Sequence, residues 1–399
     1  MSDVRAAFAS SMSEHPDSSV AIGEIIGELL ETLPATPDLC VIFSSTHHRS
    51  QLEAITHTIH ELLGPRVCVG STAAAVLGGA REVETGPALS VWAAVLPGAR
   101  VEPVRLWAEQ TIDGWQVLGL PDSAGEARSL LLLGDPFTFP IDRFLARVNS
   151  ELPHLSVIGG MASASDLPAG NVLIGHESLG GPIRHWVDGA VGVLLDSVLS
   201  PAEVSPSTVV SQGCRPIGAP FTVTASDGPV IGELGGRPAL ERLIEMITDL
   251  DETDRSLAAH GLHCGIVIED SKLDYERGDF LIRAVLGADR ERSGVAVGEA
   301  VPVGATVQFH VRDAATADED LTILLTRAGA AQPARAALVF TCNGRGAHLF
   351  GHPHHDASAV QEVLGPSIPL AGMFCAGEIG PLNGRNHLHG FTASVAVFR

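Results

Sequence analysis

A short polar loop follows an apolar run near the C-terminus of the chain. Residues Leu338–Thr341 lead into Cys342-Asn343-Gly344-Arg345-Gly346, and a second loop with Gly377 and Glu378 begins 35 residues after Cys342. Open α/β sheets place ligand-contacting groups at such strand ends. Arginine grips a carboxylate with two parallel hydrogen bonds, so the loops suit a small anionic or zwitterionic molecule. The predicted ligand-binding residues are Cys342, Asn343, Gly344, Arg345, Gly377 and Glu378.

Each charged or nucleophilic residue in these loops also has a structural interpretation. Arg345 and Glu378 bind the carboxylate and the ammonium of a zwitterion, or pair with each other, or do both in turn. If they bind ligand, Arg345→Ala weakens binding more than folding. Cys342 beside a guanidinium is a candidate reactive thiolate, but a small buried residue is the favoured interpretation. Its base would be His387 or His389, which sequence cannot place, so no catalytic residue is predicted.

A histidine cluster follows the first loop. Imidazole suits zinc, copper and nickel, which makes a metal site conceivable. Gly351 and Pro353 lie within the cluster and impose no helical spacing, so a solvated loop is the favoured interpretation. No metal or cofactor is therefore predicted. The cluster consists of His348, His352, His354, His355 and Asp356.

Composition excludes several classes of function. The 399-residue chain carries a net charge of −22, which repels nucleic acids and anionic membranes. Lys272 is the only lysine and lies in no phosphate-binding motif. The six cysteines are scattered without a Cys-x-x-Cys pair, as in a reducing compartment. The N-terminus is polar and no apolar run is long enough to span a membrane, so we expect a cytoplasmic protein.

The same order of elements recurs three times. Each copy reads as strand, helix, strand and later strand, and each second strand reaches a glycine, namely Gly70, Gly159 or Gly372. The spacing from Phe43, Leu133 and Phe340 to these glycines is 27, 26 and 32 positions. Such spacing favours duplication, although generic α/β chains share this order. We predict an α/β fold, or α+β if the later strands dominate, with layered mixed sheets of repeated strand-helix-strand-strand units.

Three segments are expected along the chain. Residues 1–35 contain a loose or helical leader and an amphipathic helix at Val20–Leu33. Residues 36–205 form an N-terminal domain, and residues 211–399 form a C-terminal domain with a helix at Pro238–Leu250. The Pro- and Ser-containing stretch Ser197–Ser211 is expected to link the two domains.

The order of motifs resembles the FIST family along nearly the whole chain. Leu155-Ser156-Val157-Ile158-Gly159-Gly160 is similar to the glycine motif of a FIST N domain, whereas Ala73–Val76 replaces an expected Gly-Glu pair. The motifs that resemble the C-terminal part begin at Gly213, Glu233, Cys342, Gly377 and His389.

This resemblance implies a sensory module that binds amino-acid-like ligands and works with a signalling protein. It favours a stand-alone small-molecule sensor for signal transduction. A thiol-dependent enzyme that uses Cys342 and a protein-interaction adaptor remain as alternatives.

Overall fold

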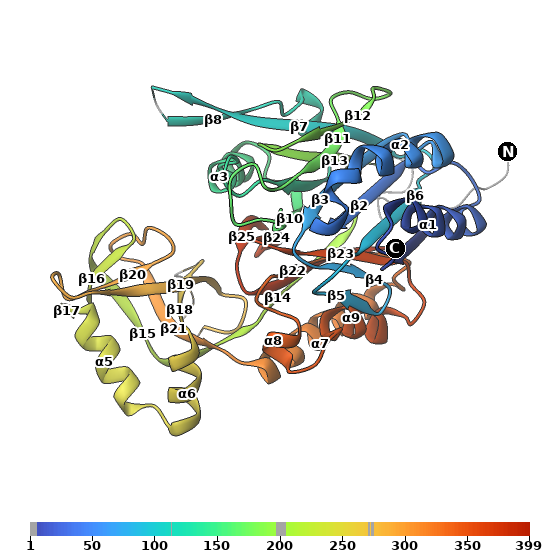
Figure 1. The fold of residues 1–399 in the computed structure, drawn as a ribbon. Helices are drawn as coiled ribbons and strands as arrows, with labels where there is room; N and C mark the ends of the chain where they lie inside the picture. The colour runs from blue at the N-terminus through green and yellow to red at the C-terminus, as the bar shows by residue number, and fades with distance from the viewer. Residues whose placement is uncertain (1–5, 113, 197–204, 270–271, 273–274) are drawn as a thin grey trace. The chain divides into compact units, whose positions relative to one another are not determined.

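The computed structural model describes residues 6–112, 114–196, 205–269, 272 and 275–399, which form two compact units (Figure 1). The first unit comprises the chain up to Val210 with Leu321–Leu388 and Thr392–Arg399, and the second comprises Ser211–Asp320 and His389–Phe391. Residues 197–204 of the expected linker lie outside the described residues. Ser205 and Pro206 lie in no helix or strand, but the expected linker is wrong over Ser207–Ser211, which belongs to strand β14 (Ser207–Gln212). No helix in the described ranges is both long and apolar enough to cross a membrane.

The first unit contains the repeated element order as three modules of the same topology. In the sequence of each module, a helix lies between two strands that pair in parallel. The later strand pairs antiparallel with the first strand, so the strand orders in the sheets are β6-β2-β3, β13-β9-β10 and β26-β22-β23. This confirms the predicted α/β class and repeated unit. The modules contain β2 (Leu39–Ser45), α2 (Leu52–Leu63), β3 (Val67–Ala73) and β6 (Leu89–Val95); β9 (Ser129–Gly134), α3 (Ile141–Glu151), β10 (Ser156–Met161) and β13 (Ala190–Asp196); β22 (Ala336–Cys342), α9 (His355–Leu364), β23 (Leu370–Cys375) and β26 (Thr392–Phe398).

Each module gives a hairpin to the sheet of another module. Strand β4 pairs with β23, β11 pairs with β3, and β24 pairs with β10, all antiparallel. The exchange is cyclic, so the three modules depend on one another for complete sheets. The hairpins are β4 (Val76–Gly78) with β5 (Arg81–Val83), β11 (Leu173–His176) with β12 (Ile183–Trp186), and β24 (Glu378–Leu382) with β25 (Arg385–His389).

The remaining elements of this unit cover the sheets or extend their edges. The expected leader is in part a strand, β1, which pairs antiparallel with β6. Both faces of this strand are covered, since Phe8 packs in the core between the modules and the adjacent Ala9 packs with residues of α1. The helix predicted at Val20–Leu33 is confirmed as α1, whose N-terminus is capped by Asp17. These elements are β1 (Ala7–Ser13), α1 (Ser18–Thr32), the short η1 (Thr46–Gln51) and η2 (Asp122–Gly125), β7 (Arg100–Thr111), β8 (Gly114–Leu118) and α8 (Ala347–Phe350). The division between the two units falls within β14 (Ser207–Gln212) and α7 (Ala314–Ala331).

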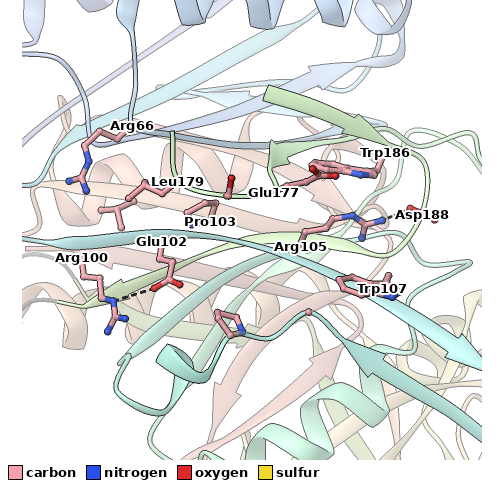
Figure 2. Close-up of a pocket in the computed structure, with 14 residues that line it drawn as sticks. Arg66, Arg100, Glu102, Pro103, Arg105, Trp107, Glu177, Leu179, Trp186 and Asp188 are labelled. Carbon is pink, nitrogen blue, oxygen red and sulfur yellow. Dashed lines mark hydrogen bonds and ion pairs between the residues drawn. The ribbon is translucent and has the colours of Figure 1, made fainter. Parts of the chain in front are cut away.

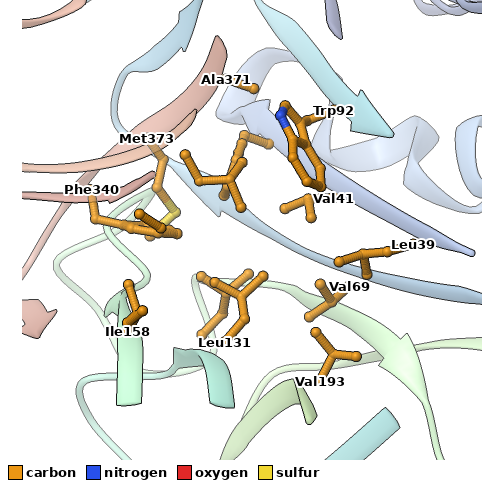
Figure 3. Packing of buried hydrophobic residues seen from close by; sticks show 14 of the residues in the cluster. Leu39, Val41, Val69, Trp92, Leu131, Ile158, Val193, Phe340, Ala371 and Met373 are labelled. Carbon is orange, nitrogen blue, oxygen red and sulfur yellow. The ribbon is translucent and has the colours of Figure 1, made fainter. Parts of the chain in front are cut away.

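Both faces of the three sheets are buried, which explains why their central strands read as unbroken apolar runs. Alternate residues such as Phe43, Leu131 and Phe340 meet in one core between the modules (Figure 3). The rings of Phe43 and Phe340 contact each other edge to face at 6.0 Å between centroids. The intervening residues face helices, as Ile42 does on the side of α1 and α2.

The second unit is a small ring of antiparallel strands. Strand β15 pairs with β21 along its first part and with β16 along its last part, so the order β15-β21-β18-β19-β20-β16 closes on itself. Of these elements the sequence predicted only α5. The unit contains β15 (Cys214–Asp227), β16 (Val230–Leu234), β17 (Arg237–Pro238), α5 (Ala239–Asp249), α6 (Glu252–His260), β18 (Leu262–Val267), β19 (Phe280–Asp289), β20 (Gly294–Val297) and β21 (Thr306–Arg312).

Candidate functional site

The loop after β22 folds back tightly on the ends of two parallel strands. The Asn343 N–H donates to the Cys375 carbonyl at 3.0 Å, and the Arg345 N–H donates to the Cys342 carbonyl at 2.8 Å. This turn leaves Asn343 exposed and Cys342 and Gly344 half-buried, and it turns Arg345 fully inward. The strand-end position predicted from the sequence is therefore correct, but the arginine lies beneath the surface.

Arg345 forms a bidentate ion pair with Asp356, the second residue of α9. Nε and Nη2 lie 2.7 and 2.8 Å from the two carboxylate oxygens, and the side chains are 0% and 1% exposed. Burial alone would raise the pKa of Asp356, but the Arg345 charge and its hydrogen bonds hold that pKa well below its usual range. Removal of Arg345 would leave the buried Asp356 carboxylate without its partner, so we expect Arg345→Ala to weaken folding strongly.

The third guanidinium nitrogen of Arg345 is different. Nη1 is buried and has no hydrogen-bond partner among the described residues. A buried N–H without a partner loses the hydrogen bonds that water would have supplied, which disfavours the folded state by about 1–3 kcal/mol. Natural proteins satisfy most such groups, so this atom calls for an explanation.

Glu378 begins β24 and is also fully buried. Its Oε2 accepts hydrogen bonds from the Thr392 N–H at 3.1 Å and from the Thr392 hydroxyl at 2.8 Å. Among the described residues no N–H or O–H group donates to the buried Oε1, although the Cys342 thiol hydrogen-bonds the carboxyl. Burial raises the pKa of Glu378 to about 8, and the Thr392 bonds, the Arg345 charge and the Cys342 thiol offset this only in part. At pH 7 the carboxyl is therefore mostly protonated.

Two further carboxyls reach this region from the first module. Glu82 accepts a hydrogen bond from the Ala357 N–H at 2.9 Å, and Glu84 accepts one from the Ala347 N–H at 2.8 Å. Both N–H groups lie in the first turn of a helix, where a negative charge is stabilised. Burial and the charge of Asp356 raise the pKa of Glu82 to about 7. The glycine at position 346 is required, because φ is +77° and a Cβ would lie 2.8 Å from the Glu84 carboxyl.

The histidine cluster is not a solvated loop throughout, so that expectation is corrected. His355 is buried, stacks on Phe350 at 3.3 Å between centroids and hydrogen-bonds Asp356 at 2.9 Å. His354 accepts a hydrogen bond from the Glu82 N–H, whereas His348 and His352 are exposed. The described residues contain no group of three or more His, Cys, Asp or Glu side chains arranged to hold a metal ion.

Comparison of the three modules distinguishes this strand end. In each module the glycine of the second strand lies against a carbonyl of the first strand. A Cβ on Gly372, for example, would lie 2.1 Å from the Val339 carbonyl oxygen. Gly70, Gly159 and Gly372 are therefore equivalent positions in the three modules. Glu378 pairs with the residue that follows Gly159. In the other two modules the residue that follows the equivalent glycine pairs with Leu173 or Val76. Arg345 lies six residues after Val339, whose carbonyl faces Gly372. The residues six positions after the equivalent carbonyls of the other two modules are His48 and Thr138. Burial lowers the pKa of His48, so both counterparts are uncharged at pH 7.

The structure brings three of the six predicted residues into electrostatic contact. Cys342, Arg345 and Glu378 each influence the ionisation of another member of this group. Asn343 and Gly344 lie at the surface above them. Gly377 is buried, and its carbonyl accepts a hydrogen bond from the Met161 N–H at 2.8 Å.

Sequence reasoning missed Asp356 as the partner of Arg345, and it missed Glu82 and Thr392 altogether. Asp356 had been grouped with the histidines. The sequence around Glu82, Arg81-Glu82-Val83-Glu84, gave no signal that distinguishes it from a solvated charged turn.

Comparison with known proteins decides the family. The FIST N domain model matches residues 38–237 and the FIST C domain model matches residues 239–381. The chain belongs to the FIST family. It is 42% identical over 387 residues, 96% of either chain, to the uncharacterized protein Mb0898c of Mycobacterium bovis. It is 40% identical over 390 residues to the uncharacterized protein Rv0628c of Mycobacterium tuberculosis, covering 97% of this chain and 98% of that one.

FIST domains are associated with the sensing of small ligands in signalling. In this FIST protein the N-terminal match runs past Val210 into the second compact unit, and the C-terminal match contains strands from both units. The sequence domains and the spatial units therefore do not coincide. The two matches are also joined within the first unit, where β4 of the N-terminal match completes the sheet of β23 in the C-terminal match.

Proposed function

We propose that this FIST protein is a sensor that binds an amino-acid-like zwitterion at the strand-end site of Cys342–Arg345 and Gly377–Glu378. One observation carries the proposal. Arg345 and Glu378 are fully buried, and in the described part of the chain Arg345 Nη1 has no hydrogen-bond partner and Glu378 Oε1 has no N–H or O–H donor. Uncharged residues suffice at their places in the other modules. Charge at this strand end is thus not a requirement of the fold.

The two atoms suit the two ends of a zwitterion. Asp356 fixes one edge of the Arg345 guanidinium and leaves Nη1 for a ligand carboxylate. Glu378 would accept an ammonium group through Oε1, and Thr392 orients its other oxygen. Because the pKa of Glu378 is raised to about 8, binding an ammonium at pH 7 releases the carboxyl proton.

Entry of the ligand requires the turn at Asn343 and Gly344 to move. Asn343 is exposed, and the turn is fixed mainly by backbone hydrogen bonds to Cys342 and Cys375. We propose that this displacement is the conformational change that a signalling partner reads. The six scattered cysteines support a cytoplasmic location for the protein.

A thermal-shift screen with the twenty amino acids tests the proposal. A ligand at about 100 times its Kd stabilises the folded state by about 2.7 kcal/mol. Calorimetry with the best ligand would then compare the wild type with Glu378→Gln, which keeps an acceptor for Thr392 but cannot become negative. We expect affinity to fall at least tenfold for Glu378→Gln.

Glu84→Gln is the matched control, because Glu84 contacts the N-terminus of α8 instead of the Arg345 guanidinium. It should bind as the wild type does. Equal affinity of the wild type and Glu378→Gln, or the absence of any stabilising amino acid, would refute the proposed site.

A further inference from the structure

A cavity of about 890 Å³ lies in the first unit, apart from the strand-end site. Its lining includes Trp107, Trp186, Leu179, Pro103, Arg66 and Arg100, and we call it the tryptophan cavity. We propose that the tryptophan cavity is a second ligand site of this protein and that it binds a small aromatic carboxylate. Its volume lies within the range of small-molecule sites, which runs from about 300 to 1,000 Å³.

The apolar part of the cavity is built from aromatic and aliphatic side chains that remain open to solvent. Trp107 is 40% exposed and Leu179 is 54% exposed. In Figure 2, Leu179 and Pro103 lie between the two ends of the cavity. Arg66 and Arg100 lie at one end, and Trp107 and Trp186 lie at the other. Exposed indole and leucine side chains that face a common cavity favour the burial of a flat apolar group.

The tryptophan end of the cavity is rigid. Arg105 lies 5.1 Å from the centroid of the Trp186 ring, and its guanidinium also pairs with Asp188 and donates to backbone carbonyls. Gly119 approaches the ring of Trp107 so closely that a Cβ there would lie 2.6 Å from it. The φ angle of Gly119 is +93°, a conformation that glycine adopts without strain and other residues do not. The walls are therefore formed before a ligand arrives, which limits the entropy lost on binding.

The other end of the cavity supplies the positive charge. Arg66 uses Nη1 to contact Asp38 at 2.9 Å, and Arg100 uses Nε and Nη1 to contact Glu102 and Glu126. Both guanidinium groups are about half exposed, and the ion pairs found among the described residues use Nη1 of Arg66 and Nε and Nη1 of Arg100. A carboxylate at this end would take parallel N–H donors from one or both arginines.

The charge around the cavity also differs from the rest of the protein. Three arginines and three carboxylates line it, so its local charge is zero, whereas the chain as a whole carries −22. An anion is therefore repelled less here than over most of the surface. Glu102 and Glu177 stand in the same lining and disfavour a ligand with several negative charges. A single carboxylate on an aromatic ring satisfies both conditions.

Calorimetry with indole-3-acetate as the probe tests the proposal on the full chain. We expect saturable binding in the micromolar to millimolar range. Trp107→Ala and the double variant Arg66→Gln/Arg100→Gln should each weaken it about tenfold or more. Trp115→Ala and Arg128→Gln are the matched controls, because Trp115 is 48% exposed and Arg128 is 64% exposed outside the lining. Both controls should bind as the wild type does.

Three results would overturn the proposal. One is the absence of saturable binding at millimolar probe, and a second is unchanged affinity in both cavity variants. The third is equally tight binding of uncharged indole, which would remove the role of the arginines. Glu378→Gln should leave the binding of indole-3-acetate unchanged, so failure of the strand-end proposal and failure of this one are distinguishable.

Discussion

Replacement of Glu378 by glutamine should change how the stability of the protein depends on pH. The pKa of Glu378 is raised from 4.5 to about 8 in the folded protein. Between these values the folded chain holds a proton that the unfolded chain has released. A rise in pH therefore favours unfolding, and stability is lost as pH rises toward the folded pKa. Glutamine resembles the protonated acid and has no such dependence.

The size of the effect follows from the shift. One proton of difference corresponds to about 1.4 kcal/mol per pH unit, so the wild type should lose roughly 2–2.5 kcal/mol relative to Glu378→Gln between pH 5.5 and 7.5. The two proteins should be similarly stable at pH 5.5. All other titrating groups are common to both and cancel in the difference.

Urea unfolding followed by tryptophan fluorescence measures this difference. Trp92, Trp107, Trp115 and Trp186 all belong to the first unit, which contains Glu378, so the signal reports on that unit alone. Glu31→Gln, at an exposed position on α1, is the control and should follow the wild type. Parallel stability curves for the wild type and Glu378→Gln over this pH range would show that burial does not hold Glu378 protonated, and the reasoning would fail.

Three further predictions follow from the same geometry. Arg345→Ala should destabilise the first unit by about 3–5 kcal/mol in urea unfolding, because Asp356 is left as a lone buried charge. The double variant Arg345→Leu/Asp356→Leu should lose much less stability, and equal losses in the two variants would contradict the ion-pair argument. Affinity for a zwitterionic ligand should rise up to about tenfold per unit between pH 6 and 8, and calorimetry in buffers of different ionisation enthalpy should detect proton release; a flat profile would exclude Glu378 from the ammonium site. In residues 211–399 expressed alone, β22, β23 and β26 should lose their protection from hydrogen exchange because β23 lacks the β4 strand, whereas Ser211–Asp320 of the second unit should stay protected; protection of β23 equal to that in the full chain would show that the hairpin exchange is dispensable.

The strand-helix-strand order and the class of the fold were predictable from the sequence. Apolar runs such as Leu39–Phe43 lie between two buried faces, and the amphipathic pattern of Val20–Leu33 packs on one face, so local periodicity reports both. The glycines at 70, 159 and 372 were readable for a similar reason, because each must pass within contact of a neighbouring carbonyl. The family resemblance also rested on short motifs that the comparisons confirm.

The partners of the charged residues were decided only by the tertiary structure. Glu82 approaches Asp356 from 274 positions away because its hairpin joins the sheet of another module. The local sequence does not encode such an exchange, because the hairpin would have the same residue pattern if it paired with the sheet of its own module. The early strand at Ala7–Ser13 and the ring of strands in the second unit escaped notice for the same reason, as their pairing partners lie far away in the chain. Residue types and strand ends are local properties, whereas burial, and with it the ionisation of Glu378, depends on the surroundings that only the folded chain supplies.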